Sequence, residues 1–258
     1  MKAEEIFRLD GQVALVTGAS SGLGVRFAEV AAANGAAVVL VARRAERLKA
    51  LKEKIEKAGG RAAVAEADVM DRAAVARAFD AAEKAFGTVT LLVNNAGVAH
   101  ANRAVDMPEE EWRRVIGTNL DAVFFTAQEA AKRMLAAKKR GAIVNIASIL
   151  GLGVSKGTVA YAVAKAAVIQ LTKSLALELA FKGVRVNAIA PGFVVTEINR
   201  EFLAGEGAGM TRHIPAGRFG EEHDLDGPFL LLASDAGRFM NGSVIVVDGG
   251  QVLAIPPG

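Results

Sequence analysis

One segment of the chain sets two polar side chains in an otherwise apolar run. Residues 159–171 read VAYAVAKAAVIQL and contain Tyr161, the only tyrosine, with Lys165 four residues later. On an α-helix this spacing places both side chains on one face, one turn apart. A phenol has a pKa of about 10, and a nearby ammonium group favours its ionised form. The pair therefore predicts general acid–base chemistry, with a chance alignment on an amphipathic helix as the alternative.

A glycine-rich segment follows the first apolar strand pattern. Residues 13–18 read VALVTG, and the chain continues as ASSGLG into an amphipathic stretch at 22–34. At such a turn, glycine lets backbone N–H groups approach a pyrophosphate at the start of a helix. The spacing differs from the G-x-G-x-x-G fingerprint, so a tight packing turn is the alternative. The predicted cofactor contacts here are Gly18, Ser20, Ser21, Gly22, Leu23 and Gly24.

The end of the second predicted strand indicates which dinucleotide binds. In NAD-binding sheets an acidic residue about 20 residues past the glycine turn holds the ribose 2′-hydroxyl. Here VVLVARRAERL places Ala42 at that point, followed by Arg43 and Arg44. A small residue beside two guanidinium groups suits a 2′-phosphate. The sequence thus predicts NADP(H), and two solvated arginines opening a charged helix are the alternative.

The rest of the chain must position these residues, and it alternates short β-rich runs with longer helical patterns. This order predicts an α/β fold, a doubly wound parallel sheet of about seven strands with helices on both faces. No linker or repeat divides residues 1–258, which are predicted to form a single domain. Residues 199–220 are glycine-rich and are predicted to be a mobile functional loop, with a disordered insertion as the alternative. The predicted strands are 13–18, 36–42, 61–69, 88–97, 141–148, 184–192 and 243–250.

Composition restricts the classes of protein that remain. No apolar run approaches the roughly 20 residues needed to cross a bilayer, and the N-terminus lacks a secretory layout, so we expect a cytoplasmic protein without a membrane partner. The chain has no cysteine, and its three histidines lie far apart in the sequence, so no metal site is predicted. The net charge is +3, but basic residues alternate with acidic ones and aromatic platforms are missing. No nucleic-acid partner is predicted.

Five motifs in this order resemble the short-chain dehydrogenase/reductase family. They are TGASSGLG (17–24), NNAG (94–97), the asparagine of GTNLDAVF (117–124), NIAS (145–148) and YAVAK (161–165). The resemblance extends from Leu9 to Gly250. It implies a Rossmann-like fold and a small-molecule carbonyl or alcohol substrate. It also implies a homotetramer built through helices 108–138 and 156–180, with the C-terminal segment near another interface. One departure is Ala164, where the family usually has serine before the lysine.

The resemblance also implies roles for individual residues. Tyr161 would give a proton to the substrate oxygen, and Lys165 would lower the tyrosine pKa and hold the nicotinamide ribose. Ser148 would hydrogen-bond the same substrate oxygen. Asn119 would hold a water on the proton path toward Lys165, with local satisfaction of a backbone group as the alternative. The remaining implied cofactor contacts are Asp68, Val69, Asn95, Ala96, Gly97, Pro191, Gly192, Val194 and Thr196.

The sequence leaves several classes of substrate open. A β-ketoacyl thioester, a β-ketoester, a sugar-derived ketone and a bulky aryl ketone all suit a mostly apolar pocket. The prediction is NADPH-dependent, reversible reduction of a ketone to a secondary alcohol. The alternatives are an NAD-dependent alcohol or sugar dehydrogenase, an idle dinucleotide-binding protein, and an enoyl reductase, a type that tends to space the tyrosine and lysine more widely. We expect the pocket to be lined by Val98, His100, Ile149, Leu150, Val154, Phe193 and loop 199–215. If that loop closes, its Arg212 and His213 would meet an acidic group of the substrate.

Overall fold

A computed structural model of the chain describes residues 2–99, 101–197, 199–205 and 207–253. Its centre is a parallel sheet of seven strands in the order β3-β2-β1-β4-β5-β6-β9. The order reverses between β1 and β4, the position at which open α/β sheets bind ligands beyond the strand ends. The doubly wound fold predicted from the sequence is confirmed. The strands are β1 Val13–Thr17, β2 Ala37–Ala42, β3 Arg61–Glu66, β4 Leu91–Asn94, β5 Gly141–Ile146, β6 Val184–Pro191 and β9 Val244–Val247.

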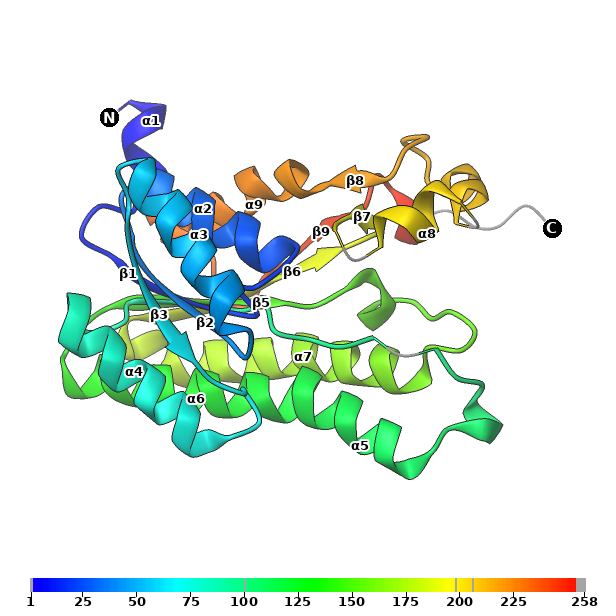
Figure 1. Cartoon of the computed structure of the whole chain (residues 1–258), viewed down its shortest axis with the longest axis horizontal. Coiled ribbons are helices and arrows are strands. Elements are labelled where there is room, and N and C mark those ends of the chain that lie inside the picture. Colours follow the sequence, from blue (N-terminus) through cyan, green and yellow to red (C-terminus); the bar gives the residue numbers. More distant parts are fainter. Residues whose placement is uncertain (1, 100, 198, 206, 254–258) are drawn as a thin grey trace.

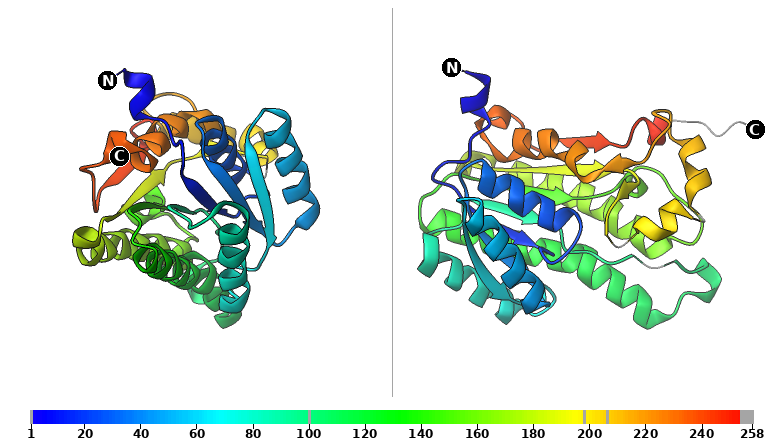
Figure 2. Two further views of the ribbon diagram at one scale, coloured as in Figure 1. Left: turned by 90° about the vertical axis from the view of Figure 1, so that its left-hand side faces the viewer. Right: turned by 45° about the horizontal axis from the view of Figure 1, so that its top comes forward.

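Helices cover both faces of this sheet (Figures 1 and 2). On one face lie α2 (Leu23–Ala33), α3 (Ala45–Lys57) and α9 (Asp226–Ala233). On the other face lie α4 (Arg72–Phe86), α5 (Glu109–Ile116), α6 (Ala122–Ala136) and α7 (Val159–Leu179). Two short helices, α1 (Ala3–Ile6) and α8 (Arg200–Ala204), lie outside these layers.

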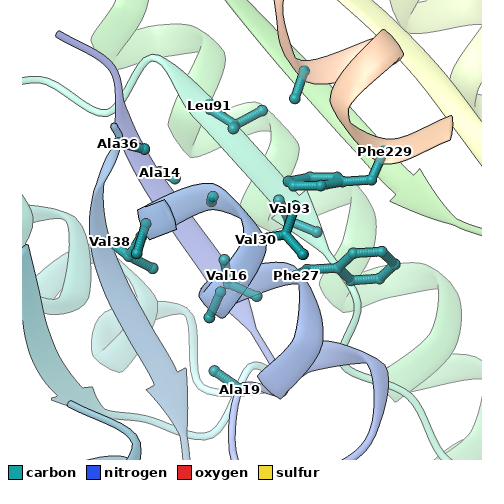
Figure 3. Packing of buried hydrophobic residues seen from close by; sticks show 14 of the residues in the cluster. Ala14, Val16, Ala19, Phe27, Val30, Ala36, Val38, Leu91, Val93 and Phe229 are labelled. Carbon is teal, nitrogen blue, oxygen red and sulfur yellow. The ribbon is translucent and has the colours of Figure 1, made fainter. Parts of the chain in front are cut away.

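Each face of the sheet has its own hydrophobic core, because successive side chains of a strand point to opposite faces. In β1, Val16 packs into the core under α2 and α9, whereas Leu15 packs into the core against α4 and α6. Phe27 of α2 and Phe229 of α9 meet in the first core with ring centroids 5.0 Å apart (Figure 3). Burial on both faces explains why the strands read as continuous apolar runs.

Two regions differ from the simple pattern expected. The helical region predicted from 108 to 139 is two helices joined by a π-helical turn, Gly117–Asp121. The predicted loop 199–220 contains α8 and a 3-10 helix at Ala208–His213. It ends at β8 (Gly220–Glu221), which pairs with β7 (Val194–Val195) in a separate small sheet. Other 3-10 turns are Ala104–Asp106, Ile149–Gly151, Ala180–Lys182, Glu222–Leu225, Asp235–Gly237 and Gln251–Leu253.

None of the helices in the described ranges is long and apolar enough to cross a bilayer.

Candidate active site

The ends of several strands open into a cleft of about 580 Å³, which is within the size range of small-molecule sites. The cleft brings together nearly every residue predicted to act on substrate or cofactor. Among the predicted catalytic and cofactor-binding residues, Gly24 and Asn119 are the two that do not line it. The predicted residues that do line it are Gly18, Ser20, Ser21, Gly22, Leu23, Arg43, Arg44, Asp68, Val69, Asn95, Ala96, Gly97, Ser148, Tyr161, Lys165, Pro191, Gly192, Val194 and Thr196.

Tyr161 and Ser148 lie together at one end of the cleft. Tyr161 is in the first turn of α7, and Ser148 caps the 3-10 turn after β5, where its Oγ accepts a hydrogen bond from the Leu150 backbone N–H at 3.1 Å. Burial raises the pKa of Tyr161, and a hydrogen bond with Ser148 opposes that rise with a smaller effect. Desolvation thus outweighs the hydrogen bond in the protein alone, and the lowering of the tyrosine pKa expected from Lys165 together with a bound nicotinamide stays a prediction. The phenol is consequently protonated at neutral pH and can donate a proton.

Lys165 lies one helical turn from Tyr161 and is almost wholly buried. Its Nζ donates a hydrogen bond to the backbone oxygen of Ile146 at 2.7 Å and lies 5.6 Å from the centroid of the Tyr161 ring. Burial lowers the pKa of Lys165 from 10.5 to about 8, because desolvation disfavours the charged form. At neutral pH the amine therefore still carries its proton beside the phenol.

Asn119 occupies the π-helical turn, and its side chain is committed to the backbone of one residue. Its Oδ1 accepts from the Val98 N–H and its Nδ2 donates to the Val98 oxygen, both at 2.8 Å. A Cβ placed on Gly97 would lie 3.3 Å from Asn119 Oδ1 and 3.8 Å from Lys165 Nζ. This arrangement favours the alternative for Asn119, which is to satisfy local backbone groups. The water that it was expected to hold stays a prediction.

The glycine turn packs so closely against its surroundings that a side chain is excluded at Gly18 and at Gly24. Gly18 and Gly22 have φ angles of +68° and +53°, in the left-handed region that favours glycine. A Cβ on Gly24 would overlap the Gly18 carbonyl oxygen and lie 2.6 Å from Asn95 Nδ2. Asn95 Nδ2 in turn donates to the Thr17 oxygen at 3.0 Å, which ties the end of β4 to this turn. Gly24 thus acts through packing and lets α2 start directly beneath the turn.

Replacing Gly24 by alanine is expected to lower the free energy of unfolding by about 1–3 kcal/mol, because the added methyl group overpacks the turn. It should also weaken NADPH binding, because the turn can only relax by moving its backbone N–H groups. Gly227→Ala is the matched control, since a Cβ on that helical glycine meets no atom within 4 Å. Thermal denaturation and NADPH fluorescence titration check both variants. Unchanged stability and affinity in Gly24→Ala would contradict the packing argument.

The two arginines after β2 differ in their surroundings. Arg44 donates to Ser20 Oγ from Nη2 at 2.9 Å and to Ser21 Oγ from Nη2 at 2.7 Å. Arg43 is 74% exposed, and its Nη1 lies 3.7 Å from Asp68 Oδ2. Arg44 therefore anchors two hydroxyls of the glycine turn, whereas Arg43 extends into the cleft with a loose partner. Together they place two positive charges and two hydroxyl groups at this end.

A short segment that starts in β7 lines the cleft and lies against the glycine turn. Asn199 Oδ1 accepts from the Thr196 N–H at 2.7 Å, and its Nδ2 donates to the Val194 oxygen at 2.9 Å. This places Thr196 next to Gly22, where an added Cβ would lie 3.4 Å from Thr196 Cβ. Asn199 belongs to loop 199–215, which was expected to line the pocket, and it lines the cleft.

The substrate side agrees only in part with expectation. Val98 and Phe193 line the cleft, whereas Ile149 is buried beside it and Val154 is exposed outside it. Leu150, Arg212 and His213 also lie outside its lining, and His100 falls outside the described residues. Cleft-lining residues with functional groups that were not predicted are Met70, Arg114 and Thr118.

The cleft as a whole offers a proton donor at one end and an anion-binding surface at the other. Tyr161, Ser148 and Lys165 form the first, beside the end of β5. Arg43, Arg44 and the glycine turn form the second, beyond β2 and β1, on the other side of β4. A long ligand carrying phosphates at one end and a reactive ring at the other fits this layout. In the part of the chain that the structure describes, no group of three His, Cys, Asp or Glu side chains could hold a metal ion.

The chain is similar to known proteins over nearly its whole length. A family model described as "Enoyl-(Acyl carrier protein) reductase" matches residues 18–251. The chain is 37% identical to gluconate 5-dehydrogenase of Gluconobacter oxydans, over 99% of this chain and 100% of that protein. It is 36% identical to a 3-oxoacyl-[acyl-carrier-protein] reductase of Escherichia coli, over 95% and 98% of the two chains. The crystal structure of a gluconate 5-dehydrogenase from Burkholderia cenocepacia, in complex with NADP and tartrate, superposes with a TM-score of 0.93 at 36% identity, covering 98% of this chain and 100% of the other.

Proposed function

The chain belongs to the short-chain dehydrogenase/reductase family, and we propose that it uses NADPH to reduce a ketone to a secondary alcohol in a reversible reaction. The observation that carries this proposal is the position of Tyr161, Ser148 and Lys165 at one end of the cleft whose other end holds the glycine turn. A protonated phenol beside a hydroxyl and a cation is what carbonyl reduction requires, because the substrate oxygen gains negative charge.

Each of these side chains has a distinct task in the proposed reaction. Ser148 donates a hydrogen bond to the substrate oxygen and orients it toward Tyr161. Tyr161 transfers its proton to that oxygen, and its raised pKa keeps the proton available at neutral pH. Lys165 stabilises the phenolate that remains, because its ammonium group lies over the tyrosine ring. NADPH, when bound, supplies the hydride for the substrate carbon. In the reverse direction Tyr161 accepts the proton of the alcohol.

The phosphate end of the cleft supports NADP(H) as the cofactor. Arg44 already holds two hydroxyl groups of the glycine turn, and Arg43 is free to reach a 2′-phosphate. Ala42, at the end of β2, brings no carboxylate that would repel that phosphate. A similar protein, the gluconate 5-dehydrogenase from Burkholderia cenocepacia, has NADP bound in its crystal structure.

An NAD-dependent alcohol or sugar dehydrogenase is the second candidate function. The observation in its favour is the similarity to gluconate 5-dehydrogenase, a protein named for oxidising a sugar acid. It differs from the first proposal in the preferred substrate and cofactor. The proposed catalytic residues are the same, because Tyr161 and Lys165 can serve both ketone reduction and alcohol oxidation. The description of the matching family model adds enoyl reduction, but the Tyr-x-x-x-Lys spacing here is the one associated with carbonyl chemistry.

Steady-state assays of nicotinamide absorbance test the proposal directly. Consumption of NADPH with β-ketoesters or simple ketones is the expected result, and gluconate or alditols with NADP+ or NAD+ probe the second candidate. An enoyl thioester in the same panel tests double-bond reduction. Tight NADPH binding without turnover of any compound would instead indicate an idle dinucleotide-binding protein.

We also propose a homotetramer assembled through α5, α6 and α7. Helix α7 leaves Val163 and Leu177 exposed, and Phe181 follows just after the helix, fully exposed. Trp112 of α5 is partly exposed as well. Large exposed apolar side chains on long helices mark protein interfaces. Light scattering should therefore give a mass four times the 26.8 kDa of one chain. A monomer at micromolar concentration would contradict the assembly, and Leu177→Asp should weaken it.

A further inference from the structure

Three buried polar side chains form a hydrogen-bonded chain behind the cleft. Asn94 of β4 is 3% exposed, and Asn145 of β5 and Thr172 of α7 are 0% exposed. Asn94 Nδ2 donates to Asn145 Oδ1 at 3.0 Å, and Asn145 Nδ2 donates to Thr172 Oγ1 at 3.0 Å. None of the three lines the cleft. They cannot touch substrate or cofactor there, so their contribution must pass through other residues.

Carbonyl groups at both ends fix the direction of this chain. Asn94 Nδ2 also donates to the Val123 oxygen at 3.2 Å, and the Thr172 hydroxyl donates to the Val168 oxygen at 2.8 Å. A carbonyl oxygen can only accept, so Asn94 must donate at one end and Thr172 must donate at the other. Asn145 is left with one orientation of its amide, since a flipped amide would oppose donor to donor. The donor and the acceptor of each hydrogen bond among these three side chains are therefore fixed.

Each of these three hydrogen-bonded residues lies close to a residue of the proposed active site. Asn145 precedes Ile146, whose backbone oxygen accepts the hydrogen bond from Lys165. Thr172 follows Lys165 by seven residues, which is two helical turns and places both on one face of α7. Asn94 precedes Asn95, the residue that binds the glycine turn. The chain thus spans the two sheet strands and the helix that carry these groups.

Helix α7 needs such a directional contact, because its sequence specifies its rotation poorly. Apolar residues lie on almost every side of it, including the exposed Val163 and Leu177 and the buried Ala164, Val168 and Ala176. Burial of apolar surface is non-directional, so a helix that is apolar all round can be buried in several rotations. A buried hydrogen bond is satisfied in only one of them, because the others leave polar groups unpaired.

We propose that Thr172, held by Asn145, is a positioning residue for Lys165 and Tyr161. Its hydroxyl fixes the rotation of α7 on β5, so that Lys165 Nζ meets the Ile146 oxygen and Tyr161 faces Ser148. This inference rests on the proposed function, because it assigns the chain a role in the same reaction. It predicts that the hydroxyl of Thr172, and not its volume, supports turnover.

The test compares two variants of Thr172 that separate hydroxyl from shape. Thr172→Val keeps the shape but leaves Asn145 Nδ2 without its acceptor, whereas Thr172→Ser keeps the hydroxyl. We expect Thr172→Val to lower kcat for ketone reduction by roughly 5- to 30-fold, with the KM for the ketone within about 2-fold of wild type. Thr172→Ser should retain kcat within about 3-fold. All assays are run well below the unfolding midpoint of each variant, measured by thermal denaturation.

Thr126→Val is the matched control, because Thr126 is buried to the same degree on α6. It should leave kcat unchanged. The proposal is overturned if Thr172→Val loses only thermal stability, if Thr172→Ser is as impaired as Thr172→Val, or if Thr126→Val has the same effect on kcat. Failure of the proposed function is distinguishable, since the wild-type protein would then turn over no ketone in the same assay. In that case, Thr172→Val would lose thermal stability and Thr172→Ser would retain it. The three hydrogen-bonded side chains would then have a structural role only, which also overturns the proposal.

Discussion

Replacing Tyr161 by phenylalanine is expected to lower ketone reduction by at least about 100-fold, which is the usual contribution of a positioned proton donor. The substitution removes only the hydroxyl. The ring keeps its place beneath the Lys165 ammonium, and Lys165 keeps its hydrogen bond to the Ile146 oxygen. NADPH affinity should therefore change little, because the phosphate end of the cleft is untouched. Turnover of a ketone substrate and NADPH fluorescence titration measure the two effects separately.

A spectroscopic control is available because Tyr161 is the only tyrosine of the chain. The ultraviolet change on phenol ionisation reports this one residue, and it must vanish in Tyr161→Phe. In the wild-type protein the titration should lie above the ordinary value of 10.0, since burial raises the pKa of Tyr161. Turnover retained in Tyr161→Phe would remove the phenol from the mechanism. A phenol that ionises near neutral pH without cofactor would instead favour the expectation drawn from the sequence.

The sequence was sufficient for the fold because the sheet is buried on both sides. The central strands are then short, mostly apolar runs, as in Val38 to Val41 of β2, and turn residues follow them. The edge strand β3 has charged residues at both of its ends and is partly exposed. In a parallel sheet the carboxyl ends of these strands meet at one edge. Motifs placed at strand ends, such as Ser148 after β5 and Gly18 after β1, were therefore expected to share one cleft, and they do.

What the sequence missed depends on tertiary contacts that no local pattern carries. In the protein alone, the direction of the Tyr161 pKa depends on how much protein surrounds the phenol, whereas the sequence shows only the lysine one turn away. The π-helical turn at Gly117–Asp121 interrupts a helical pattern without a proline, and Gly117 at its start is only a weak signal of the irregularity. Asn119 was read as part of a regular helix, although this turn directs its side chain to Val98.

The two arginines after β2 also show that the sequence does not reveal the contacts of individual side chains. Their sequence positions are adjacent, and both were assigned to one phosphate. The structure separates them, because Arg44 folds back onto Ser20 and Ser21 while Arg43 extends past Asp68. Arg44 therefore maintains the glycine turn as well as adding charge. Arg43 is the better probe of cofactor choice, since its removal leaves the hydrogen bonds of the turn intact.

Arg43→Ala is expected to raise the KM for NADPH by roughly 10- to 100-fold and to leave the KM for NADH nearly unchanged. A guanidinium–phosphate contact contributes about 1.5–3 kcal/mol, and NADH has no 2′-phosphate to lose. The effect should fall at the low end of that range, because Arg43 is largely exposed to solvent and Arg44 remains nearby. Adding Ala42→Asp should shift the preference further toward NADH, because a carboxylate at the end of β2 repels the phosphate and accepts hydrogen bonds from the free ribose hydroxyls.

Lys49→Ala provides the matched control for this cofactor experiment. Lys49 is an exposed cation on α3, the helix that begins just after Arg43 and Arg44, but it pairs with Glu46 and does not line the cleft. It tests whether any loss of positive charge from α3 weakens NADPH binding through the long-range field. Steady-state kinetics with both cofactors should show the shift in preference for Arg43→Ala and not for Lys49→Ala. If the two variants behave alike, Arg43 does not bind the phosphate. If the wild-type protein already prefers NADH, the second candidate function replaces the first, and the arginines belong to the solvated start of α3.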